Sequence, residues 1–250
     1  MMIDGCDTEG GGVSLPPLAW DELPALFPGL PGADRWLPLL QRHAALVEAA
    51  APAVRVTSVS PADVVRRQYA ESLELWRLAT GALAPDVVVD VGSGGGYPGM
   101  VIATVAPHTA VHLVEPLRKR ARLLEELAVA LGLTNVTVHP QRAEEAGRGA
   151  LREAAALVTA RAVAALPVLL EYTAPLARPG GMLALAKGSG LPGELAAAGR
   201  ALALLGCGTP LPLRMREAIN GLAYVLLVPK AVPTPAAYPR RPGMATRRPL

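Results

Sequence analysis

Apolar and polar positions follow two different periods in this chain, and the change between them comes near Asp86. From there to residue 230, short β-branched runs alternate with stretches of helical length, which is typical of parallel strands joined by crossover helices. The predicted strands are Val87–Val91, Ala110–Glu115, Val136–His139, Ala156–Ala160, Met182–Ala186 and Leu222–Pro229. The predicted helices between them are Pro98–Ala106, Pro116–Leu131, Ala143–Glu153, Leu166–Leu176 and Leu191–Leu205. The pattern therefore predicts an α/β fold around a mostly parallel sheet.

The end of this region breaks the alternation. The stretch Thr209–Leu213 is followed by Leu222–Val228 without a connection of helical length. Parallel strands need a long crossover, whereas antiparallel strands can be joined by a short turn. We therefore expect a hairpin here, with an antiparallel final strand.

Before Asp86 the period is helical. Trp36–Ala50 predicts an amphipathic helix that Pro52 stops. Its apolar positions share one side: Leu39, Leu40, Ala44 and Val47. Ser60 and Pro61 are residue types preferred at a helix start, and they predict a second helix over Asp63–Ala79. These two helices precede every predicted strand, so we expect them to form an N-terminal cap.

The chain thus divides into four parts. Residues 1–35 are rich in Gly, Pro and acidic residues and predict a flexible leader, with at most a short helix near Trp20–Phe27. Residues 36–84 form the helical cap, and residues 85–230 form the sheet domain. Residues 231–250 form a tail too rich in Pro for a helix or a central strand.

Composition excludes several classes of protein. Hydrophobic residues make up 51% of the chain and charged residues 18%, which is enough for a buried core and excludes general disorder. Two cysteines, Cys6 and Cys207, make neither a disulfide framework nor a four-ligand zinc site, and we expect no metal. We find no uncharged apolar run of about 18 residues and no export signal, so we expect a cytoplasmic protein without a membrane span.

The net charge of +3 is unevenly distributed. Residues 1–34 hold six acidic and no basic residues, whereas the tail holds four arginines and no acid: Arg240, Arg241, Arg247 and Arg248. Basic arms of this kind often contact phosphate backbones. We expect an extended basic arm, which is either a nucleic-acid contact or a solvated tail.

The run Asp90–Gly99 lies where the first predicted strand meets its helix, and four of the five residues at 92–96 are glycine. Glycines let the backbone bend tightly and approach a ligand at the carboxyl edge of a parallel sheet. Gly94-x-Gly96-x-x-Gly99, with Glu115 about 20 residues on, fits a dinucleotide site. The register Asp90-x-Gly92-x-Gly94-x-Gly96 instead looks like motif I of the S-adenosylmethionine (AdoMet) methyltransferases. An acid suits the positive charges of AdoMet and would repel a pyrophosphate.

Two further acidic positions lie at the same predicted edge. Glu115 ends the second strand, where a carboxylate accepts both ribose hydroxyls of an adenosine or caps the helix that follows. Ala143 and Glu144 follow the third strand. They can frame an adenine ring, although Glu144 alone also fits a solvated acid in the first turn of a helix.

Together these residues resemble a family, the bacterial 16S ribosomal RNA 7-methylguanosine methyltransferases, also called glucose-inhibited division protein B or methyltransferase G. The resemblance spans about residues 36–250. The matching runs are Val56-Thr57, Glu71-Ser72-Leu73, Asp90–Gly99, Gln141–Glu145, Thr159–Val163, Arg178–Gly181, Lys187-Gly188 and Tyr238–Gly243. The resemblance implies a Rossmann-like class I AdoMet-dependent methyltransferase with a seven-stranded sheet and a family-specific helical cap.

The resemblance also implies a reaction and its residues. The substrate is one guanine of 16S rRNA in the small ribosomal (30S) subunit, methylated at N7 by an enzyme expected to be a monomer. AdoMet is expected at the positions Asp90, Gly92, Gly94, Gly96, Tyr97, Glu115, Pro116, Leu117, Ala143, Glu144 and Arg161. The RNA is expected at Arg142, Arg161, Lys187, Arg240 and Arg241.

The chemistry of guanine N7 needs no general base, because its lone pair is free in the neutral ring. The four histidines, His43, His108, His112 and His139, show no cluster in the sequence. The rate is then expected to come from holding N7 in line with the methyl group at about 3–3.5 Å. Arg161 and Lys187, each at the carboxyl end of a predicted strand, are candidates to position guanine O6 or a phosphate.

Several positions depart from the family pattern. Arg55 stands where the family usually has Asn, Arg67-Gln68 where it has Lys-His, Glu71 where it has Asp, and Asn220 in a usual Glu-Arg-His. These positions are on the RNA side in the family. They leave open a catalytically weakened RNA-binding protein with a methyltransferase fold, and the glycine turn leaves open an NAD(P)-dependent oxidoreductase.

Overall fold

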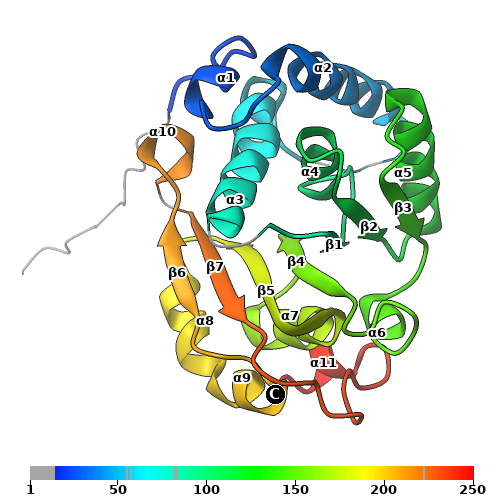
Figure 1. The fold of residues 1–250 in the computed structure, drawn as a ribbon, viewed down its shortest axis with the longest axis vertical. Helices are drawn as coiled ribbons and strands as arrows, with labels where there is room; N and C mark the ends of the chain where they lie inside the picture. The colour runs from blue at the N-terminus through cyan, green and yellow to red at the C-terminus, as the bar shows by residue number, and fades with distance from the viewer. Residues whose placement is uncertain (1–14, 55, 57, 82–83, 222) are drawn as a thin grey trace, which may run out of the picture.

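A seven-stranded sheet organises the structure, a computed structural model that describes residues 15–54, 56, 58–81, 84–221 and 223–250. The strand order is β3-β2-β1-β4-β5-β7-β6 (Figure 1). The strands are β1 (Val87–Val91), β2 (Ala110–Val114), β3 (Val136–His139), β4 (Ala155–Arg161), β5 (Ala177–Lys187), β6 (Leu211–Arg214) and β7 (Tyr224–Pro229). β1 to β5 pair in parallel, and β7 pairs antiparallel with β5 and β6. The α/β class and the C-terminal hairpin are confirmed.

Helices cover both faces of the sheet (Figure 1). One face carries α1 (Leu23–Leu26), α2 (Ala33–Ala50), α3 (Glu71–Thr80), α4 (Gly99–Val105) and α5 (Arg118–Leu131). The other carries α6 (Ala143–Ala146), α7 (Leu166–Thr173), α8 (Leu191–Ala197) and α9 (Gly199–Leu204). Because both faces are covered, the central strands read as continuous apolar runs rather than as alternating ones. In the described residues, no helix is long and apolar enough to cross a membrane.

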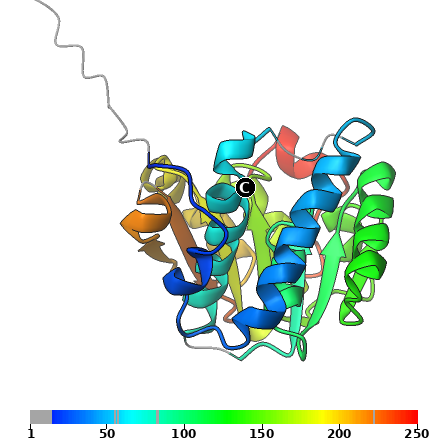
Figure 2. The ribbon, with the colours of Figure 1, turned by 90° about the horizontal axis from the view of Figure 1, so that it is seen from above.

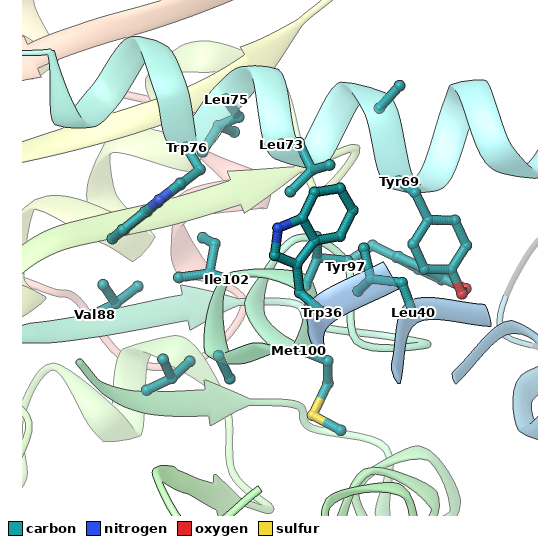
Figure 3. Packing of buried hydrophobic residues seen from close by; sticks show 14 of the residues in the cluster. Trp36, Leu40, Tyr69, Leu73, Leu75, Trp76, Val88, Tyr97, Met100 and Ile102 are labelled. Carbon is teal, nitrogen blue, oxygen red and sulfur yellow. The ribbon is translucent and has the colours of Figure 1, made fainter. Parts of the chain in front are cut away.

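The cap packs as an outer layer on this sheet. Seen from above, α2 crosses over α4 between α3 and α5 (Figure 2). Trp36 and Leu40 of α2 meet Leu73 of α3 and Ile102 of α4 in one buried cluster (Figure 3). Each of these side chains is at most 2% exposed, so the cap is part of the main hydrophobic core.

The second cap helix differs from the single α-helix expected over Asp63–Ala79. It begins with a 3-10 turn at Pro61–Asp63, continues as a π-helix over Val65–Ala70, and becomes α-helical only at Glu71. The wider π-helical turn carries the residues that face the site described below, which is where such turns often occur.

The N-terminal boundary also differs from expectation. Residues 1–14 of the expected leader lie outside the described residues, as do Arg55, Thr57 and Leu222. Residues 15–35 do not form a leader, because Leu23 and Phe27 are buried against the cap and Ala33 already begins α2. The acidic composition of this segment gave no indication that Leu23 and Phe27 would be buried.

Two other expectations on helices were wrong. The helix expected over Ala143–Glu153 stops at Ala146, since Gly147 and Gly149 lead into turns. The helix expected over Leu191–Leu205 is divided in two at Ala198.

The tail is not an extended arm. It packs on α6 and α7 and includes a short helix, α11 (Met244–Arg247), despite its proline content (Figure 1). Arg152 donates to the carbonyls of Tyr238 at 2.8 Å and Thr234 at 2.5 Å, so charged groups of the domain hold its backbone.

A buried carboxylate ties the cap to the hairpin. Glu74 of α3 is fully buried and accepts hydrogen bonds from Arg77 at 2.9 Å and from Arg216 at 2.7 Å. Arg216 also donates to the carbonyl of Leu26 at 2.7 Å, beside the short helix α10 (Glu217–Asn220). Burial by itself raises the pKa of Glu74, but the hydrogen bonds from the two arginines outweigh it and lower the pKa below its usual value. The ion pair between Glu74 and Arg216 thus joins α1, α3 and the β6–β7 connection.

We expect Glu74→Gln to lower the free energy of unfolding by about 3 kcal/mol at pH 7, because it removes the charge of a fully buried carboxylate to which two arginines bind. Urea denaturation followed by circular dichroism measures this. Glu126→Gln is the matched control, since the Arg122–Glu126 pair of α5 has 81% and 61% of its side chains exposed and should matter by less than about 0.5 kcal/mol. Equal losses in the two variants would contradict this role of Glu74.

Candidate functional site

The glycine turn between β1 and α4 lies at the carboxyl edge of the sheet. Gly92 (φ +73°) and Gly94 (φ +56°) adopt left-handed backbone conformations that most residues avoid. A Cβ on Gly92 would lie 2.8 Å from the side chain of Val163, whereas a Cβ on Gly94 would meet nothing closer than 3.8 Å. The turn therefore packs tightly on one side and is open on the other.

Asp90 holds this turn in place from below. It is fully buried, and its Oδ1 accepts the hydroxyl hydrogen bond of Thr159 on β4 at 2.7 Å. Its Oδ2 accepts the N–H of Gly99, the first residue of α4, at 3.2 Å. Burial raises the pKa of Asp90 against the opposing effect of these donors. The sequence places Asp90 in contact with a cofactor, but the structure places it under the turn.

The start of α4 is closed to a pyrophosphate. An anion at a helix N-terminus needs free backbone N–H groups. Here the N–H of Gly99 donates to Asp90, the N–H of Met100 donates to the carbonyl of Gly96 at 2.8 Å, and Pro98 has none. The geometry thus disfavours the dinucleotide interpretation of the glycine turn.

Glu115 joins the turn to the end of β2. Its side chain is 2% exposed, and it accepts the N–H of Gly94 at 3.0 Å and the N–H of Leu117 at 2.9 Å. The second bond precedes α5 (Arg118–Leu131), whose N-cap is Leu117 and which has no side-chain cap, so the expectation that Glu115 caps this helix was wrong. Pro116 and Leu117 follow at the surface, where Leu117 is 53% exposed.

A cavity of about 510 Å³ opens above the turn. Its floor is the glycine turn with Tyr97, and its walls come from the cap and from β4. The residues around it are Val56, Ser58, Val59, Arg67, Gln68, Glu71, Gly92, Ser93, Gly94, Gly95, Tyr97, Arg120, Arg161 and Ala162. We call it the main cavity. The cap residues among them lie outside the motif of the glycine turn. The sequence marked Val56 and Glu71 as parts of runs that match the family, and Arg67, Gln68 and Glu71 as departures from its pattern.

A smaller cavity of about 100 Å³ lies on the other side of Gly92. It is lined mainly by apolar groups, together with Arg142, Glu144 and Tyr172. Ala143 and Glu144 meet here with Pro116, as the sequence predicts for an adenine frame. Val163 and Tyr172 also line it. Val163 ends a run that matches the family, whereas no sequence signal marked Tyr172.

Another cavity, which we call the second cavity, adjoins the main cavity and has a volume of about 340 Å³. Both cavities are lined by Arg67, Glu71, Arg161 and Ala162, which therefore form a shared wall. The far side of the second cavity consists of Ala186, Lys187, Gly188, Ser189, Met215, Asn220 and Ala223. Ala162 has a φ of +54°, a strained value for a residue with a side chain, and such strain tends to occur at functional sites.

Arg161 is the centre of the shared wall. Its guanidinium donates to the carbonyl of Arg67 and to the side chain of Gln68, and lies 3.6 Å from the carboxylate of Glu71. It also lies over the ring of Tyr97, 5.5 Å from the centroid. Burial lowers the pKa of Arg161, while Glu71 opposes this shift. The π-helical turn of the cap supplies both acceptors, so Arg161 joins β4 to the cap.

Four of the departures from the family pattern lie around Arg161: Arg67, Gln68, Glu71 and Asn220. Asn220 donates to Glu71 Oε1 at 2.9 Å, and Arg67 lies 3.1 Å from the same oxygen. Gln68, Glu71 and Asn220 therefore form one bonded network with Arg161. Residues that look unrelated in the sequence depart from the pattern at one place in space.

The other expected RNA residues lie in different settings. Lys187 is 2.6 Å from Glu194 and donates to the carbonyl of Ala164 at 3.1 Å, while lining the second cavity. Arg142 is exposed at the start of α6 and lines the small cavity. Arg240 is paired with Glu171 at 2.5 Å, and Arg241 is exposed. The structure therefore does not bring these arginines together with Arg161.

The histidines are less scattered than the sequence suggests. His112 Nδ1 lies 3.0 Å from His139 Nε2 on neighbouring strands, so the expectation of no cluster was wrong for this pair. In the described part of the chain, no group of three or more potential metal ligands occurs.

His43 belongs to a buried chain of polar side chains beneath the turn. Its Nδ1 lies 2.9 Å from the hydroxyl of Tyr69, which lies 3.1 Å from the hydroxyl of Tyr97. Burial lowers the pKa of His43 to about 4. A neutral imidazole on α2 therefore supports the floor of the main cavity through two tyrosines.

Comparison with known proteins adds a family to this geometry. The family model "GidB: rRNA small subunit methyltransferase G" matches residues 37–209. The ribosomal RNA small subunit methyltransferase G of Roseiflexus castenholzii is 38% identical over 226 residues, covering 89% of this chain and 95% of its own. The enzyme of the same name from Chloroflexus aggregans is 40% identical over 193 residues, covering 75% and 78%.

A solved structure has the same fold. The crystal structure of cofactor-bound Rv0187 from MTB covers 88% of this chain and 99% of its own, with a TM-score of 0.59 and 22% sequence identity. At this identity the likeness concerns the fold alone.

We expect Gly94→Asp to weaken binding of S-adenosylhomocysteine by about 100-fold, or roughly 3 kcal/mol. Asp tolerates a positive φ, but its carboxylate would enter the main cavity close to that of Glu115. Isothermal titration calorimetry measures the affinity. Gly180→Asp is the matched control, because Gly180 has a φ of +83° and open space around it at an exposed position of β5. Undiminished affinity in Gly94→Asp would show that ligands bind elsewhere.

His43 predicts a dependence of stability on pH. An unfolded histidine takes up a proton near pH 6.5, whereas the folded one does so only near pH 4. Stability contributed by neutral His43 is therefore present above pH 6.5 and lost as the pH falls to 4, by up to roughly 3 kcal/mol.

The measurement is urea denaturation at a series of pH values. His43→Gln should flatten the decline between pH 6.5 and 4, whereas His108→Gln, at an exposed position, should leave it unchanged. An identical pH dependence in His43→Gln and the wild type would refute this assignment.

Proposed function

The chain belongs to the GidB family of ribosomal RNA small subunit methyltransferases G, and from this premise we propose that it methylates N7 of a guanine in 16S rRNA. The methyl donor is AdoMet, whose sulfonium supplies an electrophilic methyl group. The observation that carries the proposal is the pair of adjoining cavities with one shared wall. A donor and an acceptor can occupy neighbouring spaces there.

The residues around the glycine turn fit AdoMet better than a dinucleotide. The main cavity is open at Gly94. The backbone N–H groups of Gly94 and Leu117 already orient the carboxylate of Glu115. Glu115 would accept the ribose hydroxyls. The small cavity, with Ala143, Glu144 and Pro116, would take the adenine ring. Since the N–H groups of Gly99 and Met100 at the start of α4 are already bonded within the protein, the geometry favours AdoMet over a ligand with a pyrophosphate.

The second cavity is the proposed place of the target guanine. Glu71 and Asn220 provide a carboxylate and an amide at its wall, which match the donors and acceptors on the edge of a guanine. Arg161 and Lys187 provide positive charge, which suits O6 or a phosphate. Guanine N7 must stay free of these donors because it is the reacting atom.

The reaction itself asks little acid–base chemistry of the chain. The lone pair of N7 forms the new bond to the methyl carbon as the bond from that carbon to sulfur breaks, so the positive charge moves from sulfur to the base. The carboxylate of Glu71 stabilises a cationic base on its side of the shared wall. The network around Arg161 holds that wall rigid, and orientation of the two reactants contributes most of the rate.

The RNA backbone is proposed to follow exposed basic residues near the cavities. Arg118 and Lys119 at the start of α5 are exposed, next to Arg120 in the main cavity, and Arg142 is exposed at α6. Phosphate contacts of this kind give an affinity that falls with salt. The proposal is completed by a monomeric enzyme that works without a metal ion.

Methyl transfer from labelled AdoMet to 30S particles that lack the modification tests this function. We expect incorporation at a single guanine, mapped by mass spectrometry of nuclease fragments. Glu71→Gln should lower incorporation by about tenfold or more while binding of S-adenosylhomocysteine changes little, because its carboxylate acts on the base. Glu125→Gln, at an exposed position of α5, is the control and should behave as wild type.

Two outcomes would overturn the proposal. Binding of S-adenosylhomocysteine without any incorporation into 30S particles would favour an RNA-binding protein that keeps the methyltransferase fold. Binding of NADH without binding of S-adenosylhomocysteine would favour an oxidoreductase.

A further inference from the structure

The C-terminal tail is held by side chains of the domain in a way that solvated arms are not. Arg152 and Arg148 donate to its backbone carbonyls, the latter to Pro239 at 2.8 Å. Glu153 accepts the backbone N–H of Thr234 at 2.7 Å, and Thr234 is 4% exposed. The tail thus follows a defined path beside α6 and α7 (Figure 1).

Arg240 is the strongest of these attachments. Glu171 of α7 has an exposed fraction of 1%. Its carboxylate accepts three hydrogen bonds from Arg240: from Nε at 2.9 Å, from a terminal guanidinium nitrogen at 2.5 Å and from the backbone N–H at 2.8 Å. Bidentate pairs of this kind fix geometry as well as charge. Arg240 is therefore committed to an ion pair within the protein, whereas Arg241 and Arg247 are exposed.

Beyond Arg240, the tail contacts two residues that line the small cavity. The backbone N–H of Gly243 donates to Glu144 Oε1 at 2.9 Å, and Thr246 in α11 lies 3.0 Å from the hydroxyl of Tyr172. Glu144 and Tyr172 both line that cavity. The two polar side chains of α6 and α7 that line it are thus each in contact with the tail.

We infer that the segment Arg240–Thr246 is a structural part of the nucleoside site, and that Arg240 positions Glu144 and Tyr172 for an adenosine ligand rather than binding RNA. The inference rests on the proposed function, since it takes the small cavity as the adenine site. Arg240 and Thr246 are positioning residues in this scheme, because they act through the two side chains that meet the ligand.

The physical reason is preorganisation. Glu144 is 3% exposed, so a carboxylate that lost the N–H of Gly243 would be left underbonded in a poorly hydrated place and would turn away. Anchoring of the tail by Glu171 keeps that N–H in position before the ligand arrives. A ligand that binds an ordered wall loses less free energy to ordering than one that must assemble it.

The test is calorimetry of S-adenosylhomocysteine and of 5′-methylthioadenosine in buffer without RNA. Arg240→Met should weaken both ligands by about tenfold, since the defect lies at the nucleoside and not at the amino-acid end. Arg240→Lys should restore part of the affinity. Methylation of 30S particles by Arg240→Met should show a raised KM for AdoMet with kcat nearly unchanged.

Arg247→Met is the matched control, because it removes the same charge from an exposed position of the tail outside the segment Arg240–Thr246. It should bind S-adenosylhomocysteine as the wild type does. If Arg240→Met does not fold, Thr246→Val decides: it removes only the contact to Tyr172 and should weaken 5′-methylthioadenosine measurably.

The outcomes separate this inference from the proposed function. A wild-type protein that binds no S-adenosylhomocysteine contradicts the proposed function. A wild type that binds it, together with an Arg240→Met or Thr246→Val variant of equal affinity, overturns the inference alone. Equal weakening by Arg247→Met would also overturn it, since charge rather than position would then be the cause.

Discussion

The shape of the site depends on one buried carboxylate. Asp90 is the penultimate residue of β1, and its two oxygens are bonded to Thr159 on β4 and to the first N–H of α4. A buried ionisable group is costly unless it is well bonded, so both donors are needed and the turn between them has little freedom. The left-handed glycines and the open side at Gly94 follow from this constraint. The same carboxylate occupies the helix N–H that a pyrophosphate would need, so one side chain both builds the turn and restricts its ligand.

The wall between the two larger cavities rests on a second constraint, the burial of Arg161. A guanidinium on β4 needs acceptors, and the π-helical turn of the cap provides them at Arg67 and Gln68. Glu71 and Asn220 extend the network to the β6–β7 connection. Taken singly, each departure from the family pattern suggests a weakened enzyme. Taken together they form a consistent set, because every polar group in the network has a partner within it.

Charge counted along the sequence was a poor guide to the tail. Four arginines without an acid suggest an arm that meets phosphates, yet Arg240 meets Glu171, which lies 69 positions away in the chain. A count of charges includes only neighbours in sequence, whereas the acid that neutralises an arginine is set by packing. The hydrogen bond from Gly243 to Glu144 brings a segment far in sequence from the glycine turn to the wall of the small cavity.

The sequence by itself determined the α/β class, the order of the strands along the chain, the antiparallel hairpin and the position of the glycine turn. These depend on local period and on residues close in sequence, such as the run Asp90–Gly99. It also placed Glu115, Ala143 and Glu144 at one edge, because the carboxyl ends of parallel strands must meet there. Only the tertiary structure decided that Asp90 lies beneath the turn, that Arg161 divides two cavities, that Leu23 and Phe27 make residues 15–35 part of the core, and that Arg240 is an internal anchor. The physical reason is that each of these features results from contacts between groups remote in sequence. The periodicity of apolar residues along the chain does not determine which partner a buried charge or an apolar side chain will contact.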